Sequence, residues 1–120
     1  MAQIYYVDDK LDLAILKASI MLPSLALGDS SKLTEGEKLV SITSPMMTKN
    51  AIDECVYSGM VSTLEGTFLV ITESNMSGGS SGGAVLDYNS KIIGMVISGD
   101  SGGHHVIRIN DIKPILENLK

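Results

Sequence analysis

Short runs of apolar residues, or of alternating apolar and polar residues, occupy most of this 120-residue chain and are separated by turn residues. Such runs are typical of β-strands, because successive side chains of a strand point to opposite faces of a sheet. They predict strands near residues 4–7, 13–17, 39–43, 55–64, 67–72, 83–86, 92–98 and 105–109. Turn-forming residues at 65–66 and 87–90 are typical of hairpin connections. We therefore expect a mostly β fold.

The C-terminal segment follows a different pattern. Its apolar residues recur with the spacing of one helical face, at Ile112, Ile115, Leu116 and Leu119. Asn110 is a suitable N-cap, and Pro114 is compatible with a helix only in the first turn. We expect a closing helix that packs on the β-structure.

Composition favours one folded domain and excludes several classes of function. Hydrophobic residues make up 44% of the chain, which is enough for a core. The formal charge is −5 and the nine Lys and Arg residues are scattered, so a nucleic-acid partner is not expected. Cys55 is the single cysteine, so no internal disulfide can form, and no His/Cys cluster indicates zinc. We expect Cys55 to be a buried strand residue, and we expect no cofactor and no metal.

The first residues of the chain show neither a basic stretch nor an apolar stretch of a secretory signal. No apolar run approaches the roughly 20 residues that a membrane-spanning helix needs. As given, the sequence therefore predicts a cytoplasmic protein without a membrane partner.

Glycine and serine dominate residues 77–83, which lie between two apolar runs. Glycines around a serine let the backbone approach a substrate carbonyl and turn two N–H groups toward one point, as an oxyanion hole requires. A flexible Gly/Ser loop is the simpler alternative for this segment taken alone. A phosphate-binding loop is disfavoured, because no Lys-Ser/Thr follows and the next element is a predicted strand.

The order of several segments resembles the trypsin-like (chymotrypsin-fold) serine proteases and, within them, the HtrA/DegP-type group. Residues 11–17 resemble the segment around the catalytic aspartate, and residues 25–42 resemble the approach to the second barrel. Residues 57–62 resemble the strand before the active-site loop, and residues 71–85 resemble the loop that bears the nucleophile. The resemblance implies the C-terminal antiparallel β-barrel of that fold, with a C-terminal α-helix.

By this resemblance Ser81 is the nucleophile, the backbone N–H groups of Gly79 and Ser81 form the oxyanion hole, and Asp12 orients the base. Ser80 stands where many members have Asp or Asn, and Ala84 stands where Pro is common. Neither departure removes a catalytic group. Taken alone, Asp12 would more simply be a turn or surface carboxylate.

The general base is the missing part of this arrangement. In the family a histidine precedes the aspartate on the first barrel, and none of the eleven residues before Asp12 is histidine. The resemblance therefore implies an incomplete triad, and we expect the polypeptide to be nearly inactive as supplied. His104 and His105 are the only histidines, and an exposed or packed strand position is the simpler expectation for each. If one pointed inward, it would lie nearer the substrate side-chain pocket and could favour acidic side chains.

Residues 99–103 spell a trypsin signature that would make Ser101 the nucleophile. We reject it because a nucleophile loop should be followed by a hairpin of two apolar strands, which Ser81 has and Ser101 lacks. By the family's layout, Ile97, Ser98 and Gly99 instead lie on the strand edge that pairs with the substrate backbone. Asn75 stands where a trypsin carries a carboxylate, so a small or polar substrate side chain is the better expectation.

These observations leave two principal hypotheses. The first is an incomplete serine endopeptidase domain, with residues 1–120 as one domain and residues 1–20 as a remnant of the first barrel and inter-barrel segment. The second is a non-catalytic half-protease that binds peptides or forms oligomers. Expected partners are a peptide or protein substrate and either a second copy of the chain or another chain that supplies the first barrel. A two-chain enzyme is a weaker third hypothesis.

Overall fold

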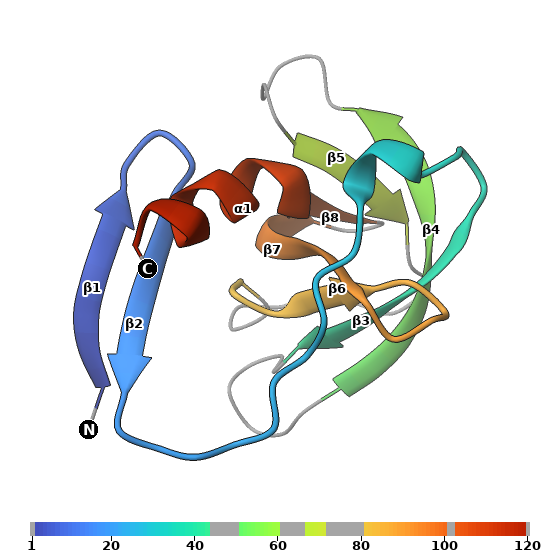
Figure 1. Ribbon diagram of the computed structural model, residues 1–120. Coiled ribbons are helices and arrows are strands. Elements are labelled where there is room, and N and C mark those ends of the chain that lie inside the picture. The colour runs from blue at the N-terminus through green and yellow to red at the C-terminus, as the bar shows by residue number, and fades with distance from the viewer. Residues whose placement is uncertain (1, 44–50, 61–66, 72–80, 101–102, 120) are drawn as a thin grey trace.

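A closed antiparallel barrel forms the body of the protein in the computed structural model, which describes residues 2–43, 51–60, 67–71, 81–100 and 103–119 (Figure 1). Within these residues the barrel has six strands, in the order β3-β4-β5-β8-β7-β6. They are β3 (Lys38–Thr43), β4 (Ala51–Met60), β5 (Thr67–Ile71), β6 (Ala84–Leu86), β7 (Ile92–Asp100) and β8 (Gly103–Arg108). The predicted mostly β architecture, an antiparallel barrel with a C-terminal helix, is confirmed.

Alternation along the strands fills the barrel interior. On β3, Leu39, Ser41 and Thr43 are buried and face inward. The central apolar cluster consists of Leu39, Cys55, Phe68, Val70, Val85, Ile93, Val96 and Val106. The ring of Tyr57 packs against that of Phe68 with centroids 5.3 Å apart. Cys55 is 2% exposed, so its prediction as a buried strand residue is confirmed.

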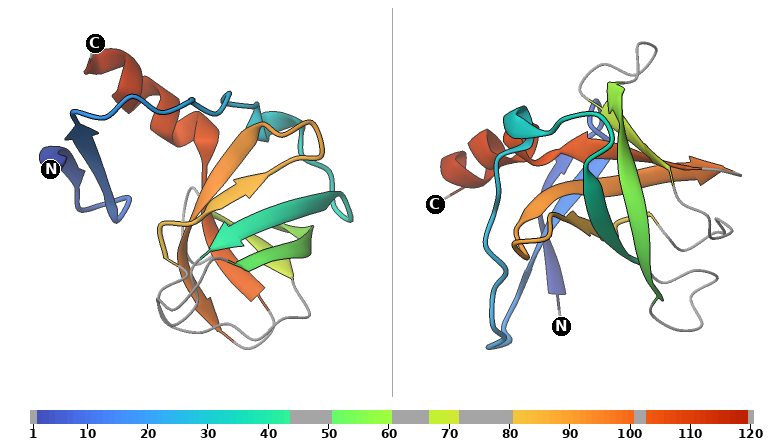
Figure 2. Two further views of the ribbon diagram at one scale, coloured as in Figure 1. Left: turned by 90° about the horizontal axis from the view of Figure 1, so that it is seen from below. Right: turned by 90° about the vertical axis from the view of Figure 1, so that its right-hand side faces the viewer.

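A separate two-stranded hairpin precedes the barrel. It is formed by β1 (Ala2–Asp8) and β2 (Leu13–Ala18), paired antiparallel. Figure 1 and the left view of Figure 2 both show it to one side of the barrel, with the terminal helix extending toward it. Two strands alone bury too little surface to be stable, so the hairpin depends on packing against other elements.

The helix α1 (Ile109–Asn118) joins the hairpin to the barrel. Ile109 and Ile112 form a second apolar cluster with Ile107 of β8 and Leu13 of β2. At the far end of the helix, the Tyr5 hydroxyl donates to the Leu119 carbonyl at 3.1 Å. The prediction that a closing helix packs on the barrel is confirmed.

Two details of that helix were predicted wrongly. Asn110 does not cap it: the N-cap is Arg108, which makes no side-chain capping hydrogen bond. Helix formation from Ile109 also places Pro114 in the second turn, where its lack of an N–H removes one helical hydrogen bond. The physical reason is that the Asn110 side chain is bound elsewhere.

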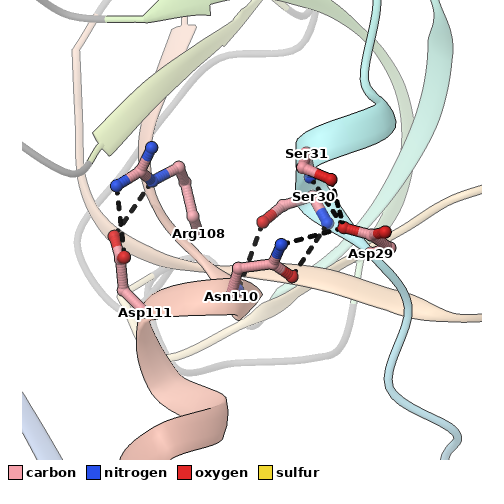
Figure 3. A network of polar contacts seen from close by, with 6 residues as sticks. All are labelled: Asp29, Ser30, Ser31, Arg108, Asn110 and Asp111. Atoms are coloured by element: carbon pink, nitrogen blue, oxygen red, sulfur yellow. Dashed lines mark hydrogen bonds and ion pairs between the residues drawn. The ribbon is translucent and has the colours of Figure 1, made fainter.

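Asn110 instead holds the segment that leads from the hairpin to the barrel (Figure 3). Its amide oxygen accepts from the Ser30 N–H at 3.1 Å, and its amide nitrogen donates to Asp29 at 2.8 Å. Ser30 and Ser31 belong to the 3-10 turn η1 (Ser30–Lys32), which Asp29 caps. Hydrogen bonds from Ser31 and then from Asn110 hold the pKa of Asp29 well below its ordinary value. We call these contacts of Asp29, Ser30 and Asn110 the clamp.

The segment before the clamp lies along the barrel in an extended form. Leu27 makes a parallel bridge with Ile92, where the Gly28 N–H donates to the Ile92 carbonyl at 2.7 Å. The Ile92 N–H in turn donates to the Ala26 carbonyl at 2.9 Å. The connection between hairpin and barrel is therefore fastened to β7 and then to α1.

Strand ends differ from the predictions by a few residues. β4 begins at Ala51 rather than 55, and β7 continues to Asp100 rather than 98, because Gly99 and Asp100 pair with β8. The turn predicted at 87–90 is present, and the Asp87 carboxylate accepts from the N–H groups of Asn89 and Lys91. The turn predicted at 65–66 lies outside the described residues. Among the described helices there is none that is long and apolar enough to span a membrane.

Candidate active site

Ser81 lies in a glycine turn immediately before β6, and its side chain is exposed. Gly82 has a φ of +88°, in the left-handed region that glycine adopts without strain. Two backbone hydrogen bonds fasten this turn to β7: Gly82 N–H to the Val96 carbonyl at 2.7 Å, and Val96 N–H to the Gly83 carbonyl at 2.9 Å. The serine is thus presented on a firmly held turn at the end of a strand.

The Ser81 hydroxyl donates to the carbonyl of Ile97 at 3.0 Å. Ile97 lies at a register shift: Val96 pairs with Val106 and Ser98 pairs with His105, so Ile97 is an extra residue in β7. Such a bulge redirects backbone groups and often occurs beside active sites. The sequence placed Ile97 on the expected substrate-pairing edge but did not predict the bulge, because an apolar residue within an apolar run carries no signal of one.

β7 extends beyond the strand that covers its other side. The β6 ladder ends at the Ala84–Met95 pair, whereas β7 continues through Ser98 and Gly99. Ser98 is exposed and directly follows the residue that accepts from Ser81. The stretch expected to pair with substrate backbone, Ile97 to Gly99, therefore begins at the residue whose carbonyl accepts from the expected nucleophile.

Asp12 lies in the turn of the β1–β2 hairpin, exposed and with a φ of +56°. The turn is shaped by Asp8, whose carboxylate accepts from the N–H groups of Lys10 and Leu11 at 3.0 Å each. On either side of Asp12, Leu11 and Leu13 pack into the second apolar cluster, which also contains Ile97. Among the described residues, however, no hydrogen bond reaches the Asp12 carboxylate.

Among the described residues, no hydrogen bond joins Asp12 to Ser81, and each is next to a residue that touches the second apolar cluster. Ile97 is common to the two, because its side chain packs against the apolar cluster to which Leu11 and Leu13 belong while its carbonyl accepts from Ser81. The side chains that flank Asp12 fix the hairpin tip, and the bulge fixes the serine. The hairpin tip must hold Asp12, and the bulge must hold Ser81, if these two side chains are to act on one base.

Several predicted site residues lie outside the described part of the chain. They are Gly79, expected in the oxyanion hole, Asn75, expected in the side-chain pocket, and Ser101, the rejected nucleophile. The context on which Ser81 was preferred is nevertheless observed: β6 and β7 form a hairpin after Ser81, whereas β8 and α1 follow residue 102. His104 and His105 both lie in β8, as expected for strand residues. Within the described residues, no group of three or more His, Cys, Asp or Glu side chains gathers as a metal ion would need.

Comparisons with known proteins identify the family to which the chain is similar. The family described as "Trypsin-like peptidase domain" matches residues 1–95. The serine protease HTRA1 of Xenopus laevis is 35% identical over 107 residues, covering 78% of this chain and 22% of that protein. The serine protease Do-like HtrA of Bacillus subtilis is 32% identical over 131 residues, covering 93% of this chain and 29% of that protein. The chain therefore spans only about a fifth to a third of the length of these relatives.

A solved structure described as the HtrA-type protease AlgW with a decapeptide has the same fold. It aligns with a TM-score of 0.83 at 22% identity, covering 98% of this chain and 40% of that chain. The chain belongs to the trypsin-like peptidase domain family, and its relatives within that family are HtrA-type serine proteases.

Proposed function

We propose that this chain supplies the nucleophile-bearing barrel of a serine endopeptidase that cleaves peptides or proteins. The supporting observation is the exposed Ser81 hydroxyl, held on a glycine turn against the bulged residue of β7, in a chain that matches the trypsin-like family. In this proposal Asp12 orients the base, and the N–H groups of Gly79 and Ser81 bind the oxyanion.

The reaction would follow the acyl-enzyme route. A base takes the Ser81 proton as the oxygen attacks the peptide carbonyl, the amine leaves with a proton from the same base, and water then releases the acyl group. Within the described residues the serine proton is directed at a carbonyl oxygen and not at a basic side chain. The proposal therefore assigns the base to a histidine outside this 120-residue sequence, on a first barrel.

Substrate would bind as an extended strand beside β7. AlgW, the structural neighbour, has been solved with a decapeptide and with a tripeptide. In this chain, Ser98 and Gly99 lie where β7 has run past β6 and where added strand pairing would place a peptide next to Ser81. A small or polar side chain remains the proposed preference at the residue before the scissile bond, on the basis of Asn75.

A fluorophosphonate probe, which reacts only with an activated serine, tests this proposal. The 120-residue chain alone should label slowly, because loss of the base in such triads costs about 10⁴-fold or more in rate. Fusion of a histidine-bearing first barrel upstream should restore labelling. Ser81→Ala should abolish it, and the matched variant Ser101→Ala should not. Fast labelling of the 120-residue chain alone would contradict the missing base, and loss of labelling in Ser101→Ala would contradict the choice of nucleophile.

A non-catalytic module that binds a partner is the second candidate function. One observation favours it: large apolar side chains of the hairpin and the following segment are exposed, at Ile4, Val7, Leu16, Ile20, Met21 and Leu22. Apolar surface of this kind commonly marks an interaction site. An apolar pocket of about 200 Å³ beside Gly82, lined also by Leu27 and Ile112, is a further apolar surface that a partner could cover. In this proposal the partner is a second copy of the chain or a separate first barrel, and a strictly monomeric mass by light scattering would exclude the dimer.

A further inference from the structure

Ser98 and His105 lie directly opposite each other on β7 and β8. Facing residues of an antiparallel pair project from the same face of the sheet. Val96 and Val106 fill the barrel interior, whereas Met95 and Ile107 pack on the outside in the second apolar cluster. β8 pairs with β5 without a register shift, so His105 shares the outer face with Ile107. Ser98 and His105 thus form a pair on the outside of the barrel.

This pair adjoins the proposed nucleophile. Ser98 follows Ile97, whose carbonyl accepts from the Ser81 hydroxyl at 3.0 Å. A peptide paired with the extended part of β7 would lie beside Ser98, and every second side chain of that peptide would project from the same face of the sheet as Ser98 and His105. Because the Ser98 side chain is small, it leaves the imidazole of His105 within reach of a substrate side chain.

The two nitrogens of the His105 imidazole are not equivalent. Nδ1 is buried and has no hydrogen-bond partner, whereas Nε2 is not among the buried atoms without a partner. A neutral imidazole carries its single proton on one nitrogen, and a buried N–H without an acceptor is costly. The proton is therefore placed on Nε2 of the half-buried His105 side chain. His105 then presents an N–H donor beside Ser98.

We propose that His105 is a specificity-determining residue, whose Nε2–H donates to a side-chain oxygen of the peptide residue that lies beside Ser98, reaching across the small Ser98 side chain. The favoured side chains are those with a carboxamide or carboxylate oxygen, namely Asn, Gln, Asp and Glu. The Ser98 hydroxyl supplies a second polar group. This inference rests on the proposed function, because it requires a peptide bound along β7 next to Ser81.

Peptide boronates test the inference, since their boron bonds to an active-site serine oxygen without a completed reaction. A series of acetylated tetrapeptide boronates in an alanine background would carry a single Gln, Glu or Leu at each position in turn. Dissociation constants would be measured by competition with a fluorescent boronate for the chain fused to a histidine-bearing first barrel, because the 120-residue chain lacks the base that activates Ser81 in the proposed enzyme. At one position Gln or Glu should bind about fivefold to tenfold more tightly than Leu, as expected for one added hydrogen bond.

Variants then assign that preference. His105→Leu removes the donor and should abolish the preference for Gln or Glu, whereas His105→Gln keeps an N–H donor and should retain most of it. The matched control Tyr88→Phe removes only a distant exposed hydrogen bond to Glu54 and should leave the preference unchanged. Circular dichroism melts check that each variant is folded. If His105→Leu does not fold, His105→Gln still tests the inference.

The outcomes separate this inference from the proposed function. Binding that depends on Ser81 but shows no preference at any position, or a preference unchanged in His105→Leu, would overturn the role of His105 and leave the proposed function standing. Absence of any boronate binding that Ser81→Ala abolishes would overturn both. A preference lost in His105→Leu and kept in His105→Gln would support both.

Discussion

Gly94 in the middle of β7 offers a stringent test of how the barrel is packed. Its φ lies outside the left-handed range, so the backbone itself would accept alanine. An alanine Cβ would, however, collide with Cγ1 of Val106, lie 2.8 Å from the Ile107 carbonyl oxygen and lie 3.0 Å from Cζ of Phe68. Val106 and Phe68 are fully buried, and a strand carbonyl cannot rotate away.

The cost of Gly94→Ala follows from these contacts. Overpacking by one methyl group in a dense core costs about 1–3 kcal/mol, and a clash that includes backbone favours the upper end. Replacing glycine by alanine also lowers the conformational entropy of the unfolded chain, which stabilises the folded state by about 0.4–1 kcal/mol. We expect the free energy of unfolding to fall by about 2 kcal/mol, which corresponds to roughly 6–10 °C in melting temperature for a domain of this size.

Urea unfolding followed by circular dichroism measures this loss. Gly36→Ala is the matched control, because its φ is +88° but no atom lies within 4 Å of the added Cβ. That variant should lose only the conformational cost of a left-handed residue, about 1 kcal/mol. If Gly94→Ala unfolds at the wild-type urea concentration, or is no less stable than Gly36→Ala, the account of the barrel interior is wrong.

Three further predictions concern the clamp and the buried thiol. Asn110→Ala should lower the free energy of unfolding by about 1–2 kcal/mol, because the Ser30 N–H loses its acceptor; an unchanged urea midpoint would show that the clamp does not matter. The pKa of Asp29 is lower in the folded state than in the unfolded state. Its carboxylate therefore stabilises the folded protein fully above the unfolded-state pKa, and this stabilisation is lost as the pH falls through the folded-state pKa. The difference in urea midpoint between wild type and Asp29→Asn should therefore shrink from about pH 5 to pH 2, and a growing difference would contradict the sign. Burial, with the Asp53 carboxylate nearby, raises the pKa of the Cys55 thiol to about 12, so Ellman's reagent at pH 8 should react only as the protein unfolds in urea; rapid reaction in native buffer would contradict its burial.

The barrel was predictable from sequence because its strands carry local signals. Alternation on β3 and the apolar runs of β5 and β7 mark strands without knowledge of their partners. The ends of strands were less predictable, because pairing decides them. Gly99 and Asp100 have the composition of a loop, yet they extend β7 because β8 offers them a partner.

Asn110 shows how tertiary contacts override a local preference. Its position before an apolar helical pattern is that of a capping residue, but the Ser30 N–H and Asp29 lie within its reach. The side chain therefore holds two distant segments together. The contact spans 80 residues of sequence, which local reasoning cannot anticipate.

For the candidate site, residue types were predictable and contacts were not. The glycines around Ser81 indicated an exposed nucleophile, and a turn position was the simpler expectation for Asp12, which the structure shows. The acceptor of the Ser81 proton depends on the bulge at Ile97, and the pairing of His105 with Ser98 depends on the resulting register. Both arise from the fit between β7 and β8 and not from either strand alone.

The closed ring of β3 to β8 and the two-stranded hairpin differ in how they can open. Each barrel strand has neighbours on both sides, so its amide hydrogens become exchangeable only when the ring breaks, whereas the hairpin can detach by giving up the packing of Leu11 and Leu13. In the proposed enzyme, Asp12 would move with the hairpin when the hairpin detaches, whereas Ser81 would remain on the barrel. Turnover would then scale with the fraction of molecules in which the hairpin is seated, so docking equilibrium as well as chemistry would set the observed rate.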